Sequence, residues 1–160
     1  MFNQVVEFLS RQRYGVISTI DATGAPESAL VGIAWWRSAD DCPELMFDTT
    51  SATRKAKNLD AEKRCCAVIG WEDETTVQLD GHGRRLEGAE LQAAKLDYFR
   101  AWPECRAHES WPDVAYFSIR PQWLRYSCFL RGPTIAEFDR HQLIDGFRES
   151  ASALFQPPEI

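Results

Sequence analysis

Apolar and polar residues alternate with a period of two over much of this chain, and shorter stretches follow helical spacing instead. The alternating stretches, bounded by turn residues, predict six or seven strands, at 15–21, 27–36, 44–49, 64–71, 75–87, 114–119 and 123–130. Helical spacing predicts helices at 2–12, 52–61 and 89–101, and one short helix within 135–148. Residues 102–113 are expected to be irregular, and the chain from Gly132 onward to be turn-rich.

The order of these elements predicts a mainly β fold with peripheral helices. Hairpin-like connections join most of the strands, and strict β-α-β alternation is missing, as is any G-x-G-x-x-G motif. We therefore expect a six- to seven-stranded antiparallel barrel, closed or partly closed, with helices flanking it. A length of 160 residues suits a single domain over 1–160, with 132–160 as a C-terminal tail.

The strand expected at 75–87 shows its two faces in the sequence. Apolar or small residues occupy one face, namely Val77, Leu79 and Gly81, and polar residues occupy the other, namely Thr76, Gln78 and Asp80. One face of this strand is thus expected in the core, and the other is available to a ligand or to solvent.

Charge and hydropathy exclude some partners. The net charge of −6 argues against broad nucleic-acid binding, which needs a basic face. No apolar run approaches the roughly 20 residues of a membrane span. Glu7 and Arg11 interrupt the N-terminal stretch, which therefore lacks the apolar core of a signal peptide. We expect a cytoplasmic protein that binds neither nucleic acid nor membrane.

The segment from Phe47 to Leu59 carries the clearest candidate chemistry. A strand leads into the hydroxyl residues Thr49, Thr50, Ser51 and Thr53, which the cations Arg54 and Lys55 and a helical pattern follow. Hydroxyls, free N–H groups at a helix start and two cations are the donors that a phosphate monoester needs. The alternative is an ordinary surface helix capped by Ser or Thr, since both are common caps.

Cysteine and histidine spacing predicts neither a disulfide framework nor a metal site. The cysteines are odd in number and lack a C-x-x-C pair; they are Cys42, Cys65, Cys66, Cys105 and Cys128. Cys65 and Cys66 are interpreted as small buried hydrophobes, with a vicinal redox pair as the alternative. The histidines His82, His108 and His141 show no helical i, i+4 pair and no Cys or Asp partner at ligand spacing.

Several of these motifs, in this order, resemble the pyridoxamine 5'-phosphate oxidase-like flavin-binding split barrels. The motifs are residues 15–21, Gly24-Ala25-Pro26, Phe47-Asp48-Thr49, Thr53-Arg54-Lys55, Asn58-Leu59, residues 76–81, Arg85-Leu86 and residues 119–126. The resemblance extends over nearly the whole chain to about residue 130.

The resemblance implies FMN bound between the two subunits of a homodimer, in a split β-barrel. The strand after the first hairpin would pass along the flavin ring, here at Ser28, Ala29, Leu30 and Val31. The phosphate would be held by Thr53, Arg54 and Lys55, with Thr49 just upstream. Thr76 would approach the ring, with Gln78 beside it, and Arg125 is either a surface cation or a contact to the flavin of the other subunit.

Two departures argue against pyridoxamine phosphate as the substrate. Ala29 and Ala34 stand where the true oxidases carry Arg and Lys, and the tail has no Arg-x-His segment. The resemblance favours an FMN-dependent oxidoreductase acting on an unknown small molecule, without indicating a catalytic side chain. The alternatives are a non-catalytic flavin-binding or stress-associated protein, and a split barrel using deazaflavin or haem, with His108 as the candidate haem ligand.

Overall fold

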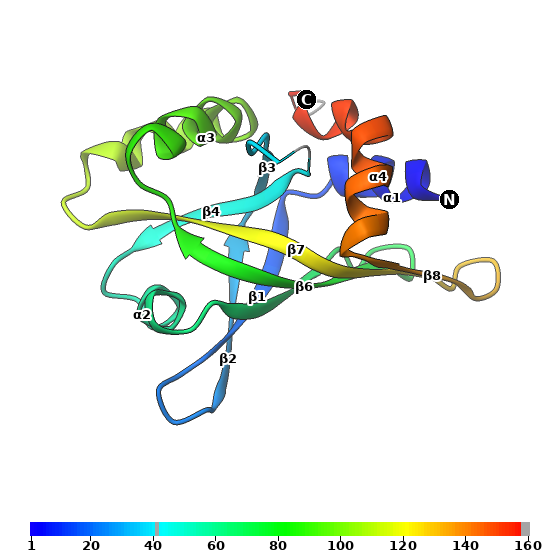
Figure 1. The fold of residues 1–160 in the computed structure, drawn as a ribbon, viewed down its shortest axis with the longest axis horizontal. Coiled ribbons are helices and arrows are strands. Elements are labelled where there is room, and N and C mark those ends of the chain that lie inside the picture. The colour runs from blue at the N-terminus through cyan, green and yellow to red at the C-terminus, as the bar shows by residue number, and fades with distance from the viewer. Residues whose placement is uncertain (41, 158–160) are drawn as a thin grey trace.

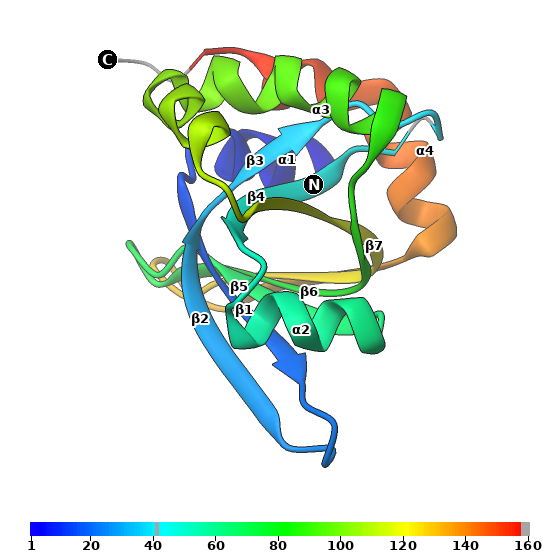
Figure 2. The same cartoon turned by 90° about the vertical axis from the view of Figure 1, so that its left-hand side faces the viewer.

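A computed structural model of the chain describes residues 1–40 and 42–157, and its centre is one curled antiparallel sheet (Figure 1). The strands are β1 (Tyr14–Ile20), β2 (Pro26–Gly32), β3 (Ala34–Trp36), β4 (Glu44–Thr50), β5 (Arg64–Ile69), β6 (Thr75–Arg85), β7 (Val114–Cys128) and β8 (Thr134–Asp139). They are ordered β2-β1-β5-β6-β7-β4-β3, and β8 also pairs with β7. Because this sheet curls into an incomplete barrel, the predicted mainly β split barrel with flanking helices is confirmed (Figure 2).

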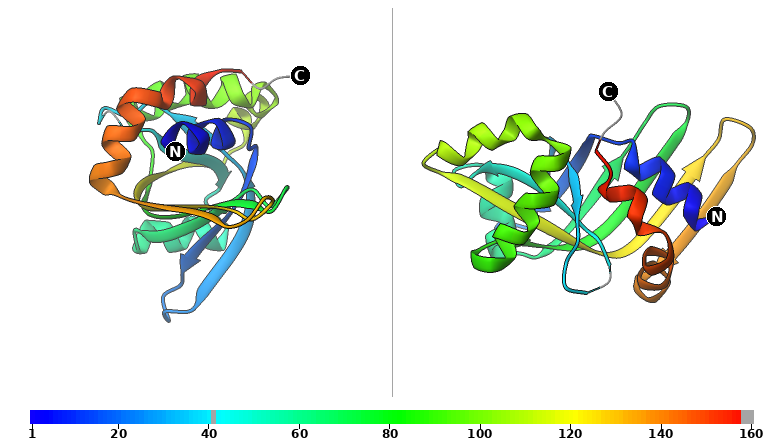
Figure 3. Two further views of the ribbon diagram at one scale, coloured as in Figure 1. Left: turned by 90° about the vertical axis from the view of Figure 1, so that its right-hand side faces the viewer. Right: turned by 90° about the horizontal axis from the view of Figure 1, so that it is seen from above.

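Helices cover the barrel on several sides. They are α1 (Phe2–Ser10), α2 (Arg54–Ala61), α3 (Gly88–Ala101) and α4 (Arg140–Ser150), with 3-10 helices η1 (Pro103–Ser110) and η2 (Ala151–Phe155). Figure 3 shows α1, α4 and η2 gathered together, while α2 packs against β1, β2 and β6. Within the described ranges, no helix has the length and apolar character needed to cross a membrane.

Strand β4 separates two hydrophobic clusters. The interior cluster fills the barrel, and its members include Ile17, Leu45, Phe47, Leu79, Phe117 and Leu124. The outer cluster lies between the sheet and α3, and its members include Trp36, Met46, Tyr98, Phe99 and Tyr116. Since successive side chains of a strand point to opposite faces, Leu45 and Phe47 enter the first cluster and Met46 enters the second.

The predicted two-faced pattern of β6 is confirmed. Val77 and Leu79 are fully buried in the interior cluster, and Gln78 and Asp80 are exposed on the other face. The helix expected at 52–61 begins two residues later, at Arg54, because Thr53 is its N-cap.

The strand expected at 27–36 is in fact two strands, β2 and β3, separated by Ile33. The Ile33 N–H donates to the Arg13 carbonyl, and its own carbonyl accepts from the Trp102 indole at 2.8 Å. The backbone of this residue therefore leaves the ladder of β2 without losing its hydrogen bonds.

The two strands expected at 114–119 and 123–130 are one continuous strand, β7. The expected break fell at residues 120–122, but Pro121 lies opposite Gly81, where the β6–β7 register shifts between Asp80 and Gly81. A bulge tolerates a proline, because one residue there makes no ladder hydrogen bond.

The C-terminal region is more regular than predicted. Residues 134–139, expected to be turn-rich or helical, form β8 against β7. Helix α4 begins only after Asp139, whose side chain accepts from the Gln142 N–H in a capping box. Leu143, Phe147 and Leu154 then pack into the interior cluster. Residues 102–113, expected to be irregular, contain η1.

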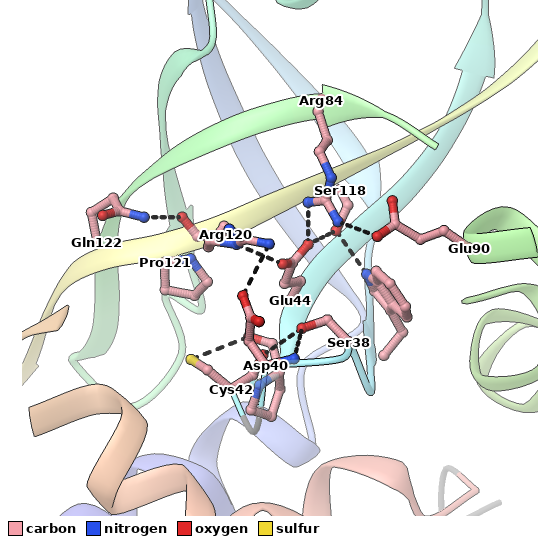
Figure 4. Close-up of polar contacts among 12 residues, drawn as sticks. Ser38, Asp40, Cys42, Glu44, Arg84, Glu90, Ser118, Arg120, Pro121 and Gln122 are labelled. Carbon is pink, nitrogen blue, oxygen red and sulfur yellow. Dashed lines mark hydrogen bonds and ion pairs between the residues drawn. The ribbon is translucent and has the colours of Figure 1, made fainter. Parts of the chain in front are cut away.

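A buried carboxylate connects the strands at one end of the barrel (Figure 4). Glu44 is fully buried on β4 and accepts hydrogen bonds from Ser118 at 2.6 Å, from Arg120 at 2.9 Å and from Arg84. Burial by itself would raise the pKa of Glu44, but hydrogen bonds from Ser118, Arg84 and Arg120 outweigh it and hold the pKa below its ordinary value. Trp36 in turn donates to Ser118 at 2.7 Å, so that Glu44 links β3, β4, β6 and β7.

We expect Glu44→Gln to lower the free energy of unfolding by about 2–4 kcal/mol, because it leaves two guanidinium groups without their buried partner. Urea denaturation at neutral pH measures this loss. Glu7→Gln is the matched control, since it removes a surface pair with Arg11 that contributes about 0–1 kcal/mol.

The stabilities of the parent protein and of Glu44→Gln should also depend differently on pH. Because the pKa of Glu44 is lowered by folding, its contribution is complete above the unfolded-state pKa and is lost as the pH falls through the folded-state value. The stability difference between the parent and Glu44→Gln should therefore shrink as the pH falls through the acidic range below the ordinary pKa of a glutamate. An unchanged difference over that range would contradict the assigned role of the carboxylate.

Candidate functional site

A groove of about 230 Å³ lies where β2 meets the start of α2. Its lining residues come from three elements and are Thr19, Glu27, Ser28, Ala29, Arg54 and Lys55. The fold thus brings two residues of the predicted flavin strand, Ser28 and Ala29, beside the two cations of the predicted phosphate turn.

The start of α2 is organised by Thr53. Its backbone is extended, and its hydroxyl accepts from the Ala56 N–H at 3.4 Å and donates to the Thr50 carbonyl at 3.0 Å. The Thr49 hydroxyl lies 3.0 Å from that of Thr53. Both threonines therefore support the helix cap, as the alternative interpretation of this segment predicted, and the cap fixes where Arg54 and Lys55 emerge.

The groove also contains a carboxylate that the sequence did not indicate as part of the site. Glu27 forms an ion pair with Arg54 and accepts from the Asn58 amide at 2.7 Å, and that amide also donates to Thr19 at 3.0 Å. The Glu27 side chain is only 12% exposed, whereas that of Arg54 is 80% exposed. Asn58 follows Arg54 by four residues, one helical turn, and this spacing was the signal that the two share a face.

Lys55 occupies a less hydrated position than Arg54. Partial burial lowers the pKa of Lys55, and the nearby Asp48 carboxylate opposes this shift only in part. An anion entering the groove would be met by two cations, one of which already has an acidic partner.

Leu30, Gln78 and Arg125 lie on the outer face of the sheet. Strand pairing places Leu30 opposite Val16, Val16 opposite Val68, Val68 opposite Gln78, and Gln78 opposite Arg125. Leu30 and Val68 are 61% and 39% exposed. One row therefore crosses five strands, and we call it the outer row; its members are Leu30, Val16, Val68, Gln78 and Arg125. Its first three members are apolar, and Leu30 and Val68 among them are exposed to solvent.

Strand geometry divides the remaining residues between the two faces. Thr76 precedes Gln78 by two residues and shares its face, and Ser28 shares the face of Leu30 and contacts Ser18 at 2.7 Å between hydroxyl oxygens. Val31 instead belongs to the interior cluster. Arg125 has a partner within the chain, because its guanidinium lies 3.4 Å from Glu137 on β8, a strand that was not predicted.

Cys65 and Cys66 are only half-buried, contrary to the expectation that both are buried. Cys65 packs against the interior cluster, and burial raises its pKa to about 12. Cys66 lies on the opposite face, and both cysteines are among the residues that line a separate hollow with His82.

A second polar cluster lies between β4 and η1, and none of its three residues is among those that line the groove. His108 Nδ1 is 2.6 Å from Asp48 Oδ2, and Cys105 lies beside both. Spacing along the chain did not indicate this cluster, because Asp48 is 60 residues from His108. The Cys105-x-x-His108 spacing within one helical turn was the available signal. Burial, with the charge of Asp48, raises the pKa of Cys105.

The comparisons with known proteins agree with this fold. The family model for pyridoxamine 5'-phosphate oxidase matches residues 1–128. No curated protein matches the sequence.

Three solved structures illustrate the likeness. A protein of unknown function from Agrobacterium tumefaciens is 17% identical, with a TM-score of 0.65 over 88% of this chain and 59% of the other. A heme binding protein from Mycobacterium smegmatis is 17% identical, with a TM-score of 0.73 over 92% of this chain and 60% of the other. This chain therefore spans about three fifths of the length of either protein.

The third structure is closer to this chain in length. A pyridoxamine 5'-phosphate oxidase-related, FMN binding protein from Nostoc punctiforme is 14% identical, with a TM-score of 0.64 over 88% of this chain and 86% of the other. At these identities the structures establish the fold alone, and the family model carries the assignment. Because that model covers most of the sequence, the chain belongs to the pyridoxamine 5'-phosphate oxidase family of split barrels.

Proposed function

We propose that this protein binds FMN in the groove between β2 and α2 and is an FMN-dependent oxidoreductase acting on a small molecule. The main support for the proposal is that Ser28 and Ala29 line the same groove as Arg54 and Lys55. A flavin mononucleotide has the matching shape, with a flat ring that can lie along a strand and a phosphate that needs cationic donors.

The donors of the groove fit a phosphate, with one competing group. Arg54 offers a planar fork of N–H donors and is largely exposed, and Lys55 adds a point charge. Glu27 would have to yield Arg54 to the phosphate while keeping its hydrogen bond from Asn58. When bound, FMN supplies hydride or electron transfer, and the residues of this chain bind and orient it.

We further propose that a homodimer completes the site across the outer row. Leu30 and Val68 at one end of this row are exposed apolar side chains, and exposed apolar groups on a sheet face are typical of a surface that a second subunit covers. Leu30 and Gln78 would then lie at the interface, and Thr76 and Arg125 would face the flavin ring.

The absorption spectrum of the purified protein tests the cofactor. Bands of oxidised flavin support FMN, whereas a Soret band would favour haem, which a structural neighbour is named for binding. Turnover with NAD(P)H and an electron acceptor then distinguishes an oxidoreductase from a non-catalytic flavin-binding protein.

Arg54→Ala should weaken FMN binding by about ten- to a hundredfold, because a hydrogen bond to a charged group contributes roughly 1.5–3 kcal/mol. Lys55→Ala should weaken it by less. Fluorescence titration measures both affinities, and riboflavin, which lacks the phosphate, should bind each variant as it binds the parent. Lys57→Ala is the control, since Lys57 is on the same helix but not among the residues that line the groove. Equal losses for FMN and riboflavin would contradict the phosphate assignment.

Glu27→Gln should strengthen FMN binding by about three- to tenfold, because it removes the carboxylate that competes for Arg54 and repels a phosphate. The amide keeps an oxygen for the hydrogen bond from Asn58. Riboflavin affinity should be unchanged, and a weaker affinity for FMN would show that Glu27 helps to hold the cofactor.

Leu30→Arg should weaken the homodimer, because it places a charge at the exposed apolar end of the outer row. Sedimentation velocity at micromolar concentration should show a dimer for the parent and a shift toward monomer for the variant. Leu96→Arg alters a leucine that is 73% exposed on α3, and it should leave the dimer intact. A parent protein that is monomeric with flavin bound would refute the dimeric site.

A further inference from the structure

Three side chains with different ligand atoms converge between β4 and η1. The ligand atoms of Asp48, Cys105 and His108 all lie within 4.8 Å of one another. Cys105 is buried, and the side chains of Asp48 and His108 are 16% and 27% exposed. A carboxylate, a thiol and an imidazole thus face one small, mostly shielded space.

The imidazole is held in place from two sides. Asp48 contacts its Nδ1 atom, and the Trp111 indole stacks on the ring with centroids 3.9 Å apart and planes 23° apart. Cys105 and His108 are spaced by one turn of η1, and Asp48 is held by the β4–β7 ladder. The three groups therefore come from rigid elements, as a ligand set requires.

A fourth side chain on the same face, that of Tyr116, has a buried hydroxyl group without a hydrogen-bond partner among the described residues. Tyr116 lies directly opposite Asp48 in the β4–β7 register, so that both side chains are on the same face of the sheet. The tyrosine is 2% exposed, and its hydroxyl has no hydrogen-bond partner among the residues that the structure describes. A buried hydroxyl of this kind is costly unless a ligand or a bound water satisfies it.

We propose that Asp48, Cys105 and His108 form a binding site for a zinc ion. Thiolate, imidazole and carboxylate together are typical ligands of Zn²⁺, whereas Mg²⁺ and Ca²⁺ prefer oxygen ligands alone. Three protein ligands leave a fourth position for water.

The charge balance of the site supports a divalent cation. Binding would displace the Cys105 proton to solvent, while His108 would bind through a neutral ring nitrogen. The thiolate and the Asp48 carboxylate then supply two negative charges against the two positive charges of the ion. This site goes beyond the proposed flavin function, because none of its ligands is among the residues that line the groove between β2 and α2.

A titration with cobalt(II) tests the proposal. The purified protein keeps whatever flavin it was isolated with, and a chelator first removes any bound metal. We expect one Co²⁺ per chain, a thiolate-to-cobalt charge-transfer band in the near ultraviolet and visible bands of a tetrahedral ion. Difference spectra against the cobalt-free protein cancel any flavin absorption. Zinc should abolish these bands, and binding should release protons.

Variants locate the ion. Cys105→Ser and His108→Ala should each weaken cobalt binding by about a hundredfold or more, since even outer partners of a metal ligand contribute ten- to a hundredfold. Cys66→Ser and His141→Ala are the matched controls, because these residues lie outside the cluster. They should bind cobalt as the parent does.

Two results would overturn the site. One is cobalt binding by the parent without a charge-transfer band, which would mean adventitious binding at other surface groups. The other is unchanged binding in folded Cys105→Ser. If that variant does not fold, folded His108→Ala decides, because a charge-transfer band that persists there at the parent's affinity would show that the ion lies elsewhere. Neither result depends on whether FMN binds.

Discussion

The burial of β4 on both faces is the constraint on which the rest of this structure depends. Leu45 and Phe47 fill the barrel, while Met46 on the other face packs beneath α3. A strand covered on two sides cannot lie at a free edge of a flat sheet, so the sheet must curl around one cluster and carry a helix over the other. The polar residues that β4 also carries must then be satisfied in place, as Glu44 is by Ser118, Arg84 and Arg120.

The spacing of apolar residues along the sequence correctly predicted the helices and strands whose buried face is defined by their own residues. The two faces of β6 and the helix after Thr53 are examples, since each depends on local spacing. The continuity of β7 through Pro121 could not be predicted, because the bulge that accommodates the proline is a property of the pairing with β6. Strand β8 was missed for a similar reason, because it is stabilised by its pairing with β7.

In the candidate site, too, the features set by local spacing were predicted and those set by strand pairing were not. Arg54 and Lys55 were recognisable because two adjacent cations at a predicted helix start are typical of a phosphate site, but their acidic neighbour Glu27 comes from strand β2. Cross-strand neighbours such as Tyr116 and Asp48 are likewise set by register, which a single sequence does not reveal. The groove therefore has less net positive charge than its motif suggests, and an anion entering it would compete with Glu27 for Arg54.

The passage from β2 to β3 has a mechanical consequence. These two strands are at opposite ends of the strand order, yet only Ile33 separates them along the chain. The seam of the barrel, where β2 and β3 meet without a ladder of hydrogen bonds, is thus crossed by the backbone itself. Its width at this point is limited to the length of one residue. Trp102 packs on this seam so tightly that a Cβ atom at Gly32 would lie 2.9 Å from its ring. No ladder of hydrogen bonds closes the barrel between β2 and β3, but the backbone connects these strands through Ile33. Any widening of the gap between them must therefore begin at the ends of the two strands that lie far from Ile33.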